Sequence, residues 1–176
     1  MITKWGPVTM IDGIPPLGDG LKLHLNSFQE TVKYASCSAW DLLYETLRKN
    51  NLPVSTVSFS ETGKPYFTES SIYFSLSHSR ELCAVAVADR PVGVDIEKCR
   101  ESFNPYLIKR SLCEAEKLVF DGDFTRVWCR KEALAKMTGE GITGYPDYID
   151  TSKFQFHEQQ IEWKGQQYWL VAVKQP

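Results

Sequence analysis

Hydrophobic positions in the first third of the chain follow a helical spacing. A helix is expected to begin at Ser27–Glu30, where a Ser followed three residues later by a Glu forms a capping box, and to stop near Asn50. Its apolar face consists of Trp40, Leu43, Tyr44 and Leu47. Apolar residues spaced three and four positions apart indicate a helix that packs against a hydrophobic core.

Shorter apolar runs, several of them alternating with polar residues, predict strands. The expected strands are residues 8–11, 54–59, 72–76, 82–88, 154–156, 161–164 and 168–173. Residues 84–87 are apolar throughout, as in a strand that is buried on both faces, and residues 170–173 repeat this pattern. We interpret the repetition as two similar α+β halves joined near residue 92.

Residues 92–97 alternate strictly between apolar side chains and Gly or acidic ones. Because strand side chains point to opposite faces in turn, Asp95 and Glu97 should project from the same face. Two carboxylates about 4 Å apart repel each other by about 4 kcal/mol at an effective dielectric constant near 20, so a bound cation would relieve them. The alternative is a pair of solvated carboxylates at a strand end.

A second helical region follows residue 104. Ser111 and Glu114 form a capping-box pattern, and a further helix should run from about Phe124 to Thr138 and end at Gly139. On that helix Glu132 and Lys136 are four residues apart, a spacing at which a surface ion pair contributes only ~0.3–0.5 kcal/mol.

Composition adds few constraints. The 176 residues include 43% hydrophobic and 24% charged residues, which is typical of a globular protein, and the formal net charge of −2 provides no general attraction to nucleic acid or anionic membrane. The five cysteines are scattered and form no Cys-x-x-Cys pair, which favours free thiols in a reducing cytoplasm. No signal peptide or membrane span is expected.

Three polar positions remain ambiguous from pattern alone. Glu132 with Asp95 and Glu97 would suit Mg²⁺, a hard ion that prefers oxygen ligands, although nothing in the sequence brings the strand and the helix together. His78 lies among serines between two expected strands and has either a structural or a binding role. Lys64, held between Gly63 and Pro65, is either a surface lysine or a phosphate contact.

Four segments, taken together and in this order, resemble the 4′-phosphopantetheinyl transferase superfamily of the surfactin-synthetase-activating type. They are residues 63–66 (GKPY), 74–79 (FSLSHS), 92–97 (VGVDIE) and 128–136 (WCRKEALAK). The last two correspond to the signature of the family, and Asp95 and Glu132 are separated by 37 positions, as this signature requires.

The resemblance implies an α+β fold with two pseudo-symmetric halves, each with an antiparallel sheet and a packed helix. The halves would be residues 1–92, shorter than in relatives, and 93–176, with the site between them. It further implies transfer of the 4′-phosphopantetheine moiety of coenzyme A to a serine of an apo acyl or peptidyl carrier protein, which releases adenosine 3′,5′-bisphosphate. Mg²⁺ would be the cofactor, with Mn²⁺ as a substitute, and the two fused halves would form a cytoplasmic monomer.

Individual roles also follow from the resemblance. Asp95, Glu97 and Glu132 would bind the metal, Glu132 would accept the serine proton, and Lys136 would face the leaving phosphate. The residues expected to bind coenzyme A are Lys33, Lys64, Ser77, His78 and Lys136. The tentative carrier-docking residues are Phe103, Tyr106, Leu107, Lys109 and Arg110, for which packing on their own core is the alternative.

Two other functions remain open from the sequence. One is a Mg²⁺-dependent hydrolase of a nucleotide pyrophosphate, and the other is a non-catalytic relative that binds coenzyme A or a carrier protein. Lys131, about 100° around the helix from Glu132, is expected to contact either the far end of the substrate or only water.

Overall fold

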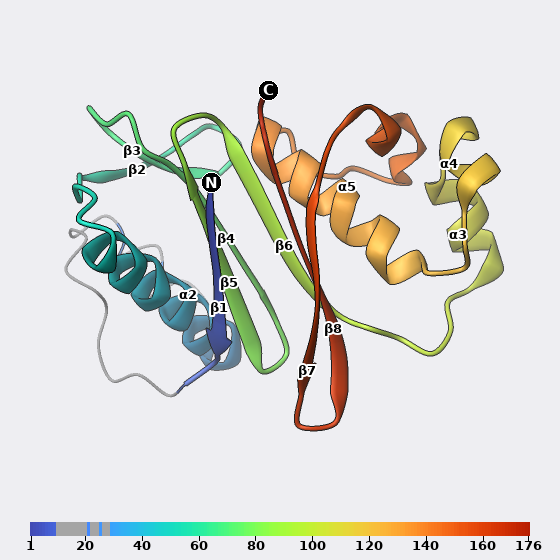
Figure 1. Cartoon of the computed structure of the whole chain (residues 1–176), viewed down its shortest axis with the longest axis horizontal. Helices are drawn as coiled ribbons and strands as arrows, with labels where there is room; N and C mark the ends of the chain where they lie inside the picture. Colours follow the sequence, from blue (N-terminus) through green and yellow to red (C-terminus); the bar gives the residue numbers. More distant parts are fainter. Residues whose placement is uncertain (10–20, 22–24, 26–28) are drawn as a thin grey trace.

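A computed structural model of the chain describes residues 1–9, 21, 25 and 29–176. Within this part, the chain forms two three-stranded antiparallel sheets and one two-stranded sheet. A long helix packs on each of the larger sheets (Figure 1). The fold class is therefore α+β, as the sequence predicted.

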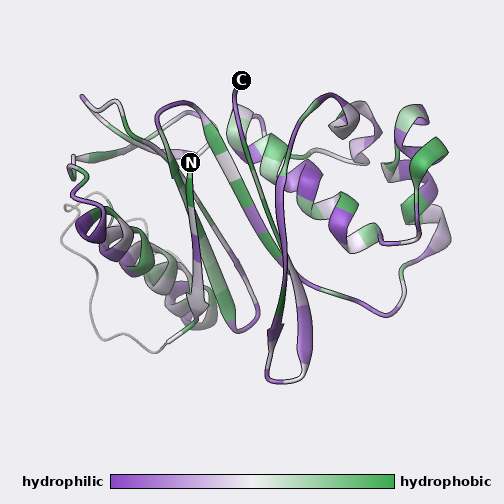
Figure 2. Ribbon diagram, viewed as in Figure 1, coloured by the Kyte–Doolittle hydropathy of each residue, from purple (hydrophilic) through white to green (hydrophobic). Residues whose placement is uncertain are grey.

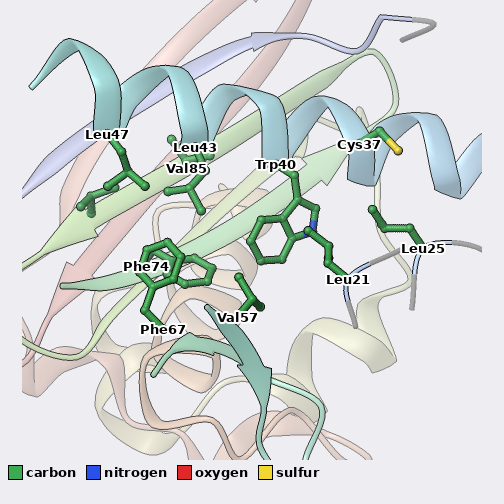
Figure 3. Packing of buried hydrophobic residues seen from close by; sticks show 11 residues of the cluster. Leu21, Leu25, Cys37, Trp40, Leu43, Leu47, Val57, Phe67, Phe74 and Val85 are labelled. Carbon is green, nitrogen blue, oxygen red and sulfur yellow. The ribbon is translucent and has the colours of Figure 1, made fainter. Parts of the chain in front are cut away.

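The first large sheet contains β1 (Ile2–Pro7), β5 (Leu82–Ala88) and β4 (Tyr73–Ser79), in that order. Helix α2 (Glu30–Lys49) covers one face of this sheet. Figure 3 shows Trp40, Leu43 and Leu47 of α2 directed toward aromatic and aliphatic side chains of the strands. The small sheet, a hairpin of β2 (Val57–Phe59) and β3 (Pro65–Phe67), contributes Val57 and Phe67 to the same core.

The second large sheet contains β6 (Val92–Lys98), β8 (Gln166–Lys174) and β7 (His157–Trp163), in that order. Helix α5 (Phe124–Thr138) packs against β6 and β8. Two short helices, α3 (Pro105–Ser111) and α4 (Glu114–Val119), precede α5 in the chain. In Figure 1 they lie to the right of α5, on the side away from the sheets. Two 3-10 turns, Pro146–Tyr148 and Thr151–Lys153, connect α5 to β7.

The two large sheets have the same connectivity. Each is built from a strand, a long helix and a hairpin, and in each the last strand lies in the centre between the other two. β5 and β8 are these central strands, which explains why the sequence of each contains a nearly continuous apolar run. This repetition confirms the pseudo-symmetric α+β architecture expected from the sequence.

A hydrophobic core joins the two sheets. Small side chains of β5 (Ala84, Ala86 and Ala88) pack against the apolar face of β6, which consists of Val92, Val94 and Ile96. Hydrophobic residues are accordingly concentrated on the strands in the middle of the molecule (Figure 2). The small side chains allow the strands to approach closely, and β4 and β6 come to lie next to each other.

Several element boundaries differ from the predictions. The first described strand is Ile2–Pro7, and β3 was not expected. Of the strand expected at residues 8–11, residues 8 and 9 are not in a strand, and residues 10 and 11 lie outside the described residues. β4 continues through Ser79, so His78 is paired with Cys83 inside a hairpin and does not lie between two strands. Residues 154–156 are not a strand; Phe154 and Phe156 instead pack beside α5 and β8. The capping box at Ser27–Glu30 lies mostly outside the described residues.

The second capping box was also placed wrongly. Ser111 ends α3, while the box at the start of α4 joins Cys113 and Glu116, whose carboxylate accepts a hydrogen bond from the Cys113 amide at 3.0 Å. α4 turns Glu116 inward, and its apolar residues Leu118 and Val119 are 88% and 76% exposed. No helix among the described residues combines the length and hydrophobicity needed to cross a membrane.

Candidate active site

A cavity of about 390 Å³ lies beside β4 and β6, where the two large sheets approach each other. Its walls come from α2, the β2–β3 hairpin, β4, β6 and α5. The polar residues that line it are Ser36, Ser77, His78, Asp95, Glu97, Glu132 and Lys136. Of the eight residues expected from the sequence to bind metal or coenzyme A or to act in catalysis, six therefore lie in one cavity: Ser77, His78, Asp95, Glu97, Glu132 and Lys136.

Close packing of β6 on α5 brings the acidic strand residues to this cavity. A Cβ atom added to Gly93 would lie 1.8 Å from the carbonyl oxygen of Ala133 and 2.6 Å from the amide nitrogen of Met137. Only glycine fits between the two backbones. Asp95 lies two residues after Gly93 and on the same face of β6. The close contact at Gly93 therefore holds Asp95 beside the turn of α5 that bears Glu132 and Lys136.

Asp95, Ser77 and Lys136 form a hydrogen-bonded triangle. The Lys136 ammonium lies 2.7 Å from Oδ1 of Asp95 and 2.8 Å from Oγ of Ser77, and the Ser77 hydroxyl donates to the same Oδ1 at 2.8 Å. Each of the three side chains comes from a different element: β6, β4 and α5. Because Asp95 is nearly buried, this charge-assisted arrangement fixes its carboxylate more firmly than a surface ion pair would.

Glu132 behaves differently from Asp95. Among the described residues its carboxylate has no hydrogen-bond or ion-pair partner, and it does not pair with Lys136 one turn later on α5. Burial raises the pKa of Glu132, and the negative charges of Asp95 and Glu97 add to this rise, whereas Lys136 opposes it. An unpaired carboxylate with a raised pKa is suited to accept a proton or a cation.

Glu97 and His78 lie at the edges of the cavity. Oε1 of Glu97 accepts a hydrogen bond from the exposed Arg100 guanidinium at 3.2 Å. His78 is exposed at its mouth, yet the surrounding protein partly desolvates the imidazole and thereby lowers its pKa. The positive charge of Lys136 lowers this pKa further, and Asp95 opposes the effect. His78 therefore favours the neutral form, which can donate or accept a hydrogen bond.

The comparison with known proteins is consistent with this geometry. A family model described as the 4′-phosphopantetheinyl transferase superfamily matches residues 91–171, which include Asp95, Glu97, Glu132 and Lys136. This part of the chain is similar to proteins of the 4′-phosphopantetheinyl transferase superfamily. Lys64, Ser77 and His78 lie outside the matched segment.

Individual relatives in the superfamily extend the match. The 4′-phosphopantetheinyl transferase gsp of Aneurinibacillus migulanus is 31% identical over 124 residues, which cover 64% of this chain and 48% of that protein. The 4′-phosphopantetheinyl transferase HetI of Nostoc sp. is 37% identical over 101 residues, 48% of this chain and 41% of that protein. The 4′-phosphopantetheinyl transferase psf-1 of Bacillus pumilus is 33% identical over 102 residues, 52% of this chain and 44% of that protein. The chain spans about half the length of the curated relatives it matches.

The donors expected of the superfamily's metal site fit a hard cation in their chemistry. Asp95, Glu97 and Glu132 contribute carboxylate oxygens to one cavity, where burial and, to a smaller extent, the charges of Asp95 and Glu97 raise the pKa of Glu132. A bound cation would favour the charged form of all three carboxylates. In the described residues, however, no three His, Cys, Asp or Glu side chains are already grouped to hold a metal ion. Binding by all three therefore requires the side chains to turn toward a common point, and a cation held by Asp95 would lie close to the Lys136 ammonium.

Two of the three lysines assigned to coenzyme A from the superfamily resemblance, Lys33 and Lys64, lie outside the wall of this cavity. The Lys64 ammonium donates to the carbonyl oxygen of Met137 at 2.8 Å, where it satisfies the C-terminal end of α5. Burial lowers the pKa of Lys64, which borders an adjoining cavity of about 270 Å³ that shares Pro65, Leu76 and Lys136 with the first. Lys33 lies on α2, one turn before Ser36 of the cavity wall.

The residues assigned to carrier docking from the resemblance divide into two groups. Phe103 and Leu107 are half-buried and pack with Leu112, Phe124 and Val127, in agreement with the alternative that they belong to a core. Tyr106, Lys109 and Arg110 are exposed. Arg110 lies over the Tyr145 ring at 5.1 Å, and Tyr106 contacts the edge of the same ring. A small cavity beside Phe103 and Leu107 also includes Glu97 and Trp128, so this surface adjoins the main cavity.

Lys131 neither lines the main cavity nor contacts solvent. It is completely buried, forms an ion pair with Glu116 at 2.7 Å and donates to the carbonyl oxygens of Pro146 and Ile149. Thr151 also donates to Glu116. The expectation of a substrate or solvent contact was thus wrong: Lys131 joins α5 to α4 and to the segment between α5 and β7. The inward face of α4 depends on Glu116, which no hydrophobic pattern reveals.

Proposed function

We propose that the protein transfers the 4′-phosphopantetheine moiety of coenzyme A to a serine of an apo acyl or peptidyl carrier protein. The observation that carries this proposal is the cavity in which Glu132, Asp95 and Lys136 meet at the junction of the two sheets. The match of residues 91–171 to the superfamily model supports the reaction class. The division into residues 1–92 and 93–176, with the site between them, is part of this proposal.

In the proposed step, the carrier serine oxygen attacks the phosphorus that bears the pantetheine arm. A new phosphorus–oxygen bond forms, and the bond to the adenosine 3′,5′-bisphosphate oxygen breaks. Glu132 accepts the serine proton, for which its unpaired carboxylate and raised pKa are suited. Lys136 provides positive charge for the leaving phosphate oxygen, and the hydroxyl of Ser77 fixes the direction of its ammonium.

Asp95, Glu97 and Glu132 would hold Mg²⁺, or Mn²⁺ in its place. When bound, the ion would neutralise negative charge on the pyrophosphate oxygens. The chain's own contribution is to supply three carboxylates on two rigid elements, at a distance fixed by the contact between Gly93 and Ala133. Phosphoryl transfer depends mainly on such positioning and on nearby cations.

Coenzyme A would extend from this cavity toward the adjoining one beside Lys64. Ser77, His78 and Lys136 would contact its phosphates. Lys64 and Lys33 would serve its 3′-phosphate end, and Lys64 would first have to leave the Met137 carbonyl. Tyr106, Lys109 and Arg110, with Phe103 and Leu107 beneath them, would receive the carrier protein. The monomeric state and the cytoplasmic location expected from the sequence remain predictions.

Release of adenosine 3′,5′-bisphosphate distinguishes the proposal from its alternatives. The protein would be incubated with Mg²⁺ and coenzyme A, with and without a panel of apo carrier proteins. Release that depends on a carrier supports the transferase. Release without any carrier, accompanied by free phosphopantetheine, would indicate a pyrophosphate hydrolase instead. Tight binding of coenzyme A without release under any condition would indicate a non-catalytic relative.

A further inference from the structure

Three serines of β4 bridge the two halves of the fold. Ser75, Ser77 and Ser79 occupy alternate positions, so their side chains share one face of the strand. Each hydroxyl oxygen accepts a hydrogen bond from a backbone amide of β6. The donors are Val94 at 3.1 Å, Ile96 at 3.4 Å and Lys98 at 3.3 Å, respectively. We refer to Ser75, Ser77 and Ser79 as the serine ladder.

The spacing of these contacts defines a register. Each serine and its amide partner are 19 positions apart, so β4 and β6 run in the same direction and advance together two residues at a time. The two strands nevertheless belong to different sheets. In a parallel sheet the β6 amides would donate to backbone carbonyl groups of β4, whereas here they donate to serine hydroxyls. Side chains therefore set the alignment of the two sheets at this edge.

The middle contact leads directly to the candidate active site. Besides accepting from the Ile96 amide, Ser77 donates to Asp95 and accepts from Lys136. One hydroxyl can donate once and accept twice, so all hydrogen-bonding capacity of Ser77 is used. Its orientation thus depends on the position of β6, which the outer serines hold on either side.

We propose that Ser75 and Ser79 are positioning residues that hold β6 in register with β4 and thereby place Asp95 against Ser77 and Lys136. Both are nearly buried, and neither lines the main cavity. Ser75 also borders the adjoining cavity beside Lys64, but its hydrogen bond, like that of Ser79, is made to β6. Their importance for transfer rests on the proposed function, whereas their effect on the register does not.

A matched pair of substitutions isolates the hydroxyl. Ser75→Thr and Ser75→Val add nearly the same volume, but only threonine retains an acceptor for the Val94 amide. Ser79→Thr and Ser79→Val form a second pair for the Lys98 amide. Because added methyl groups in a buried position can prevent folding, Ser75→Ala and Ser79→Ala provide variants without added volume.

Hydrogen exchange of the β6 amides tests the register. The valine and alanine variants should speed exchange of the amide that loses its acceptor by about fivefold or more relative to the threonine variants or wild type. They should also weaken Mn²⁺ binding to the free protein, because Asp95 is displaced. Equal exchange and equal Mn²⁺ affinity across the series would overturn the proposal, whether or not the protein is a transferase.

Turnover tests the consequence for the reaction. The valine and alanine variants should lower kcat by about tenfold to a hundredfold, the loss expected when a reacting group is misplaced, with little change in KM for coenzyme A. The threonine variants should retain most of kcat. If transfer is absent in wild type, the proposed function fails but the exchange and Mn²⁺ measurements still decide the role of the ladder. If transfer is present and the valine and threonine variants turn over equally, the positioning role is refuted.

Discussion

The ammonium of Lys136 lies 2.7 Å from Oδ1 of Asp95, although the two residues are 41 positions apart in the chain. Lys136 thus pairs with a strand carboxylate and leaves Glu132, its neighbour one helical turn earlier, without a partner among the described residues. In this arrangement a cation of the protein itself already compensates Asp95. A metal ion bound by Asp95 would be repelled by this neighbouring ammonium.

Removal of this ammonium should therefore favour metal binding. Lys136→Met should tighten Mn²⁺ binding to the free protein by about tenfold, because a competing charge disappears from Asp95 and each tenfold change corresponds to ~1.4 kcal/mol. The same variant should lose transfer activity. Titration calorimetry on the carrier-free protein measures the affinity.

Lys164→Met provides the matched control for this comparison. It removes an exposed lysine that pairs with Glu81 at 3.0 Å, far along the sequence from the proposed ligands. Its Mn²⁺ affinity should equal that of wild type. Weaker Mn²⁺ binding in Lys136→Met would show that Lys136 does not compete for Asp95.

Substitution of Gly93 should disrupt the contact that brings β6 to α5. In Gly93→Ala the new methyl group would lie 1.8 Å from the Ala133 carbonyl oxygen, so strand and helix must separate. Overpacking of this kind should lower the free energy of unfolding by about 3 kcal/mol. Urea denaturation gives the value.

Gly6→Ala serves as the reference for that experiment. Gly6 also lies in a strand, but a Cβ atom there would meet its nearest neighbour, Leu42 Cδ1, at 4.0 Å. Its unfolding free energy should stay within about 0.5 kcal/mol of wild type. A similarly small effect for Gly93→Ala would mean that the close approach of β6 and α5 is not required.

The buried pair of Lys131 and Glu116 should make stability depend on pH. Burial alone would raise the pKa of Glu116, but hydrogen bonds from Lys131, Thr151 and the Cys113 amide outweigh burial and lower it. A carboxylate with a lowered folded-state pKa stabilises the protein above its unfolded pKa, near 4.5, and this contribution is lost as the pH falls through the folded value.

Lys131→Met should accordingly lower the free energy of unfolding by about 3–5 kcal/mol at pH 7, since it leaves a buried charge uncompensated. The difference from wild type should shrink below about pH 4, where Glu116 can be protonated. Lys117→Met removes a surface lysine of α4 that pairs with Glu114 on the same helix, and it should change the free energy of unfolding little. A loss in Lys131→Met that is the same at both pH values would contradict the assignment.

Loss of the Glu132 carboxylate should separate activity from stability. Glu132→Gln should lower the rate of transfer by at least about 10²-fold, the contribution expected of a general base. The fold should be retained, because the carboxylate forms no hydrogen bond or ion pair with the described residues. Circular dichroism and urea denaturation check the fold. Retention of most activity would exclude Glu132 as base.

The sequence predicted those parts of the fold whose pattern follows from a single element. β5 was predicted with its observed bounds because all seven of its residues are buried, and α5 because Gly139 ends it in the left-handed conformation with φ of 85°. Asp95 and Glu97 were placed together by the alternation of β6. These features depend on local spacing, which a sequence displays directly.

Contacts between elements could not be predicted in the same way. Lys131 looked like a surface lysine because its partner Glu116 lies on another helix and occupies a position with no hydrophobic signature. Lys136 pairs with Asp95 because of the packing at Gly93, which joins segments 41 positions apart. The alternate serines of β4 were visible in the sequence, but their partners on β6 were not.

The central claim is that Glu132 and its neighbours transfer phosphopantetheine to a carrier serine. The most direct measurement is the intact mass of an apo carrier protein after incubation with coenzyme A, Mg²⁺ and either wild type or Glu132→Gln. We expect wild type to add the mass of one phosphopantetheine group to the carrier and Glu132→Gln to add almost none in the same time. An unchanged carrier mass with wild type across fatty-acid, polyketide and nonribosomal-peptide carriers would contradict the claim.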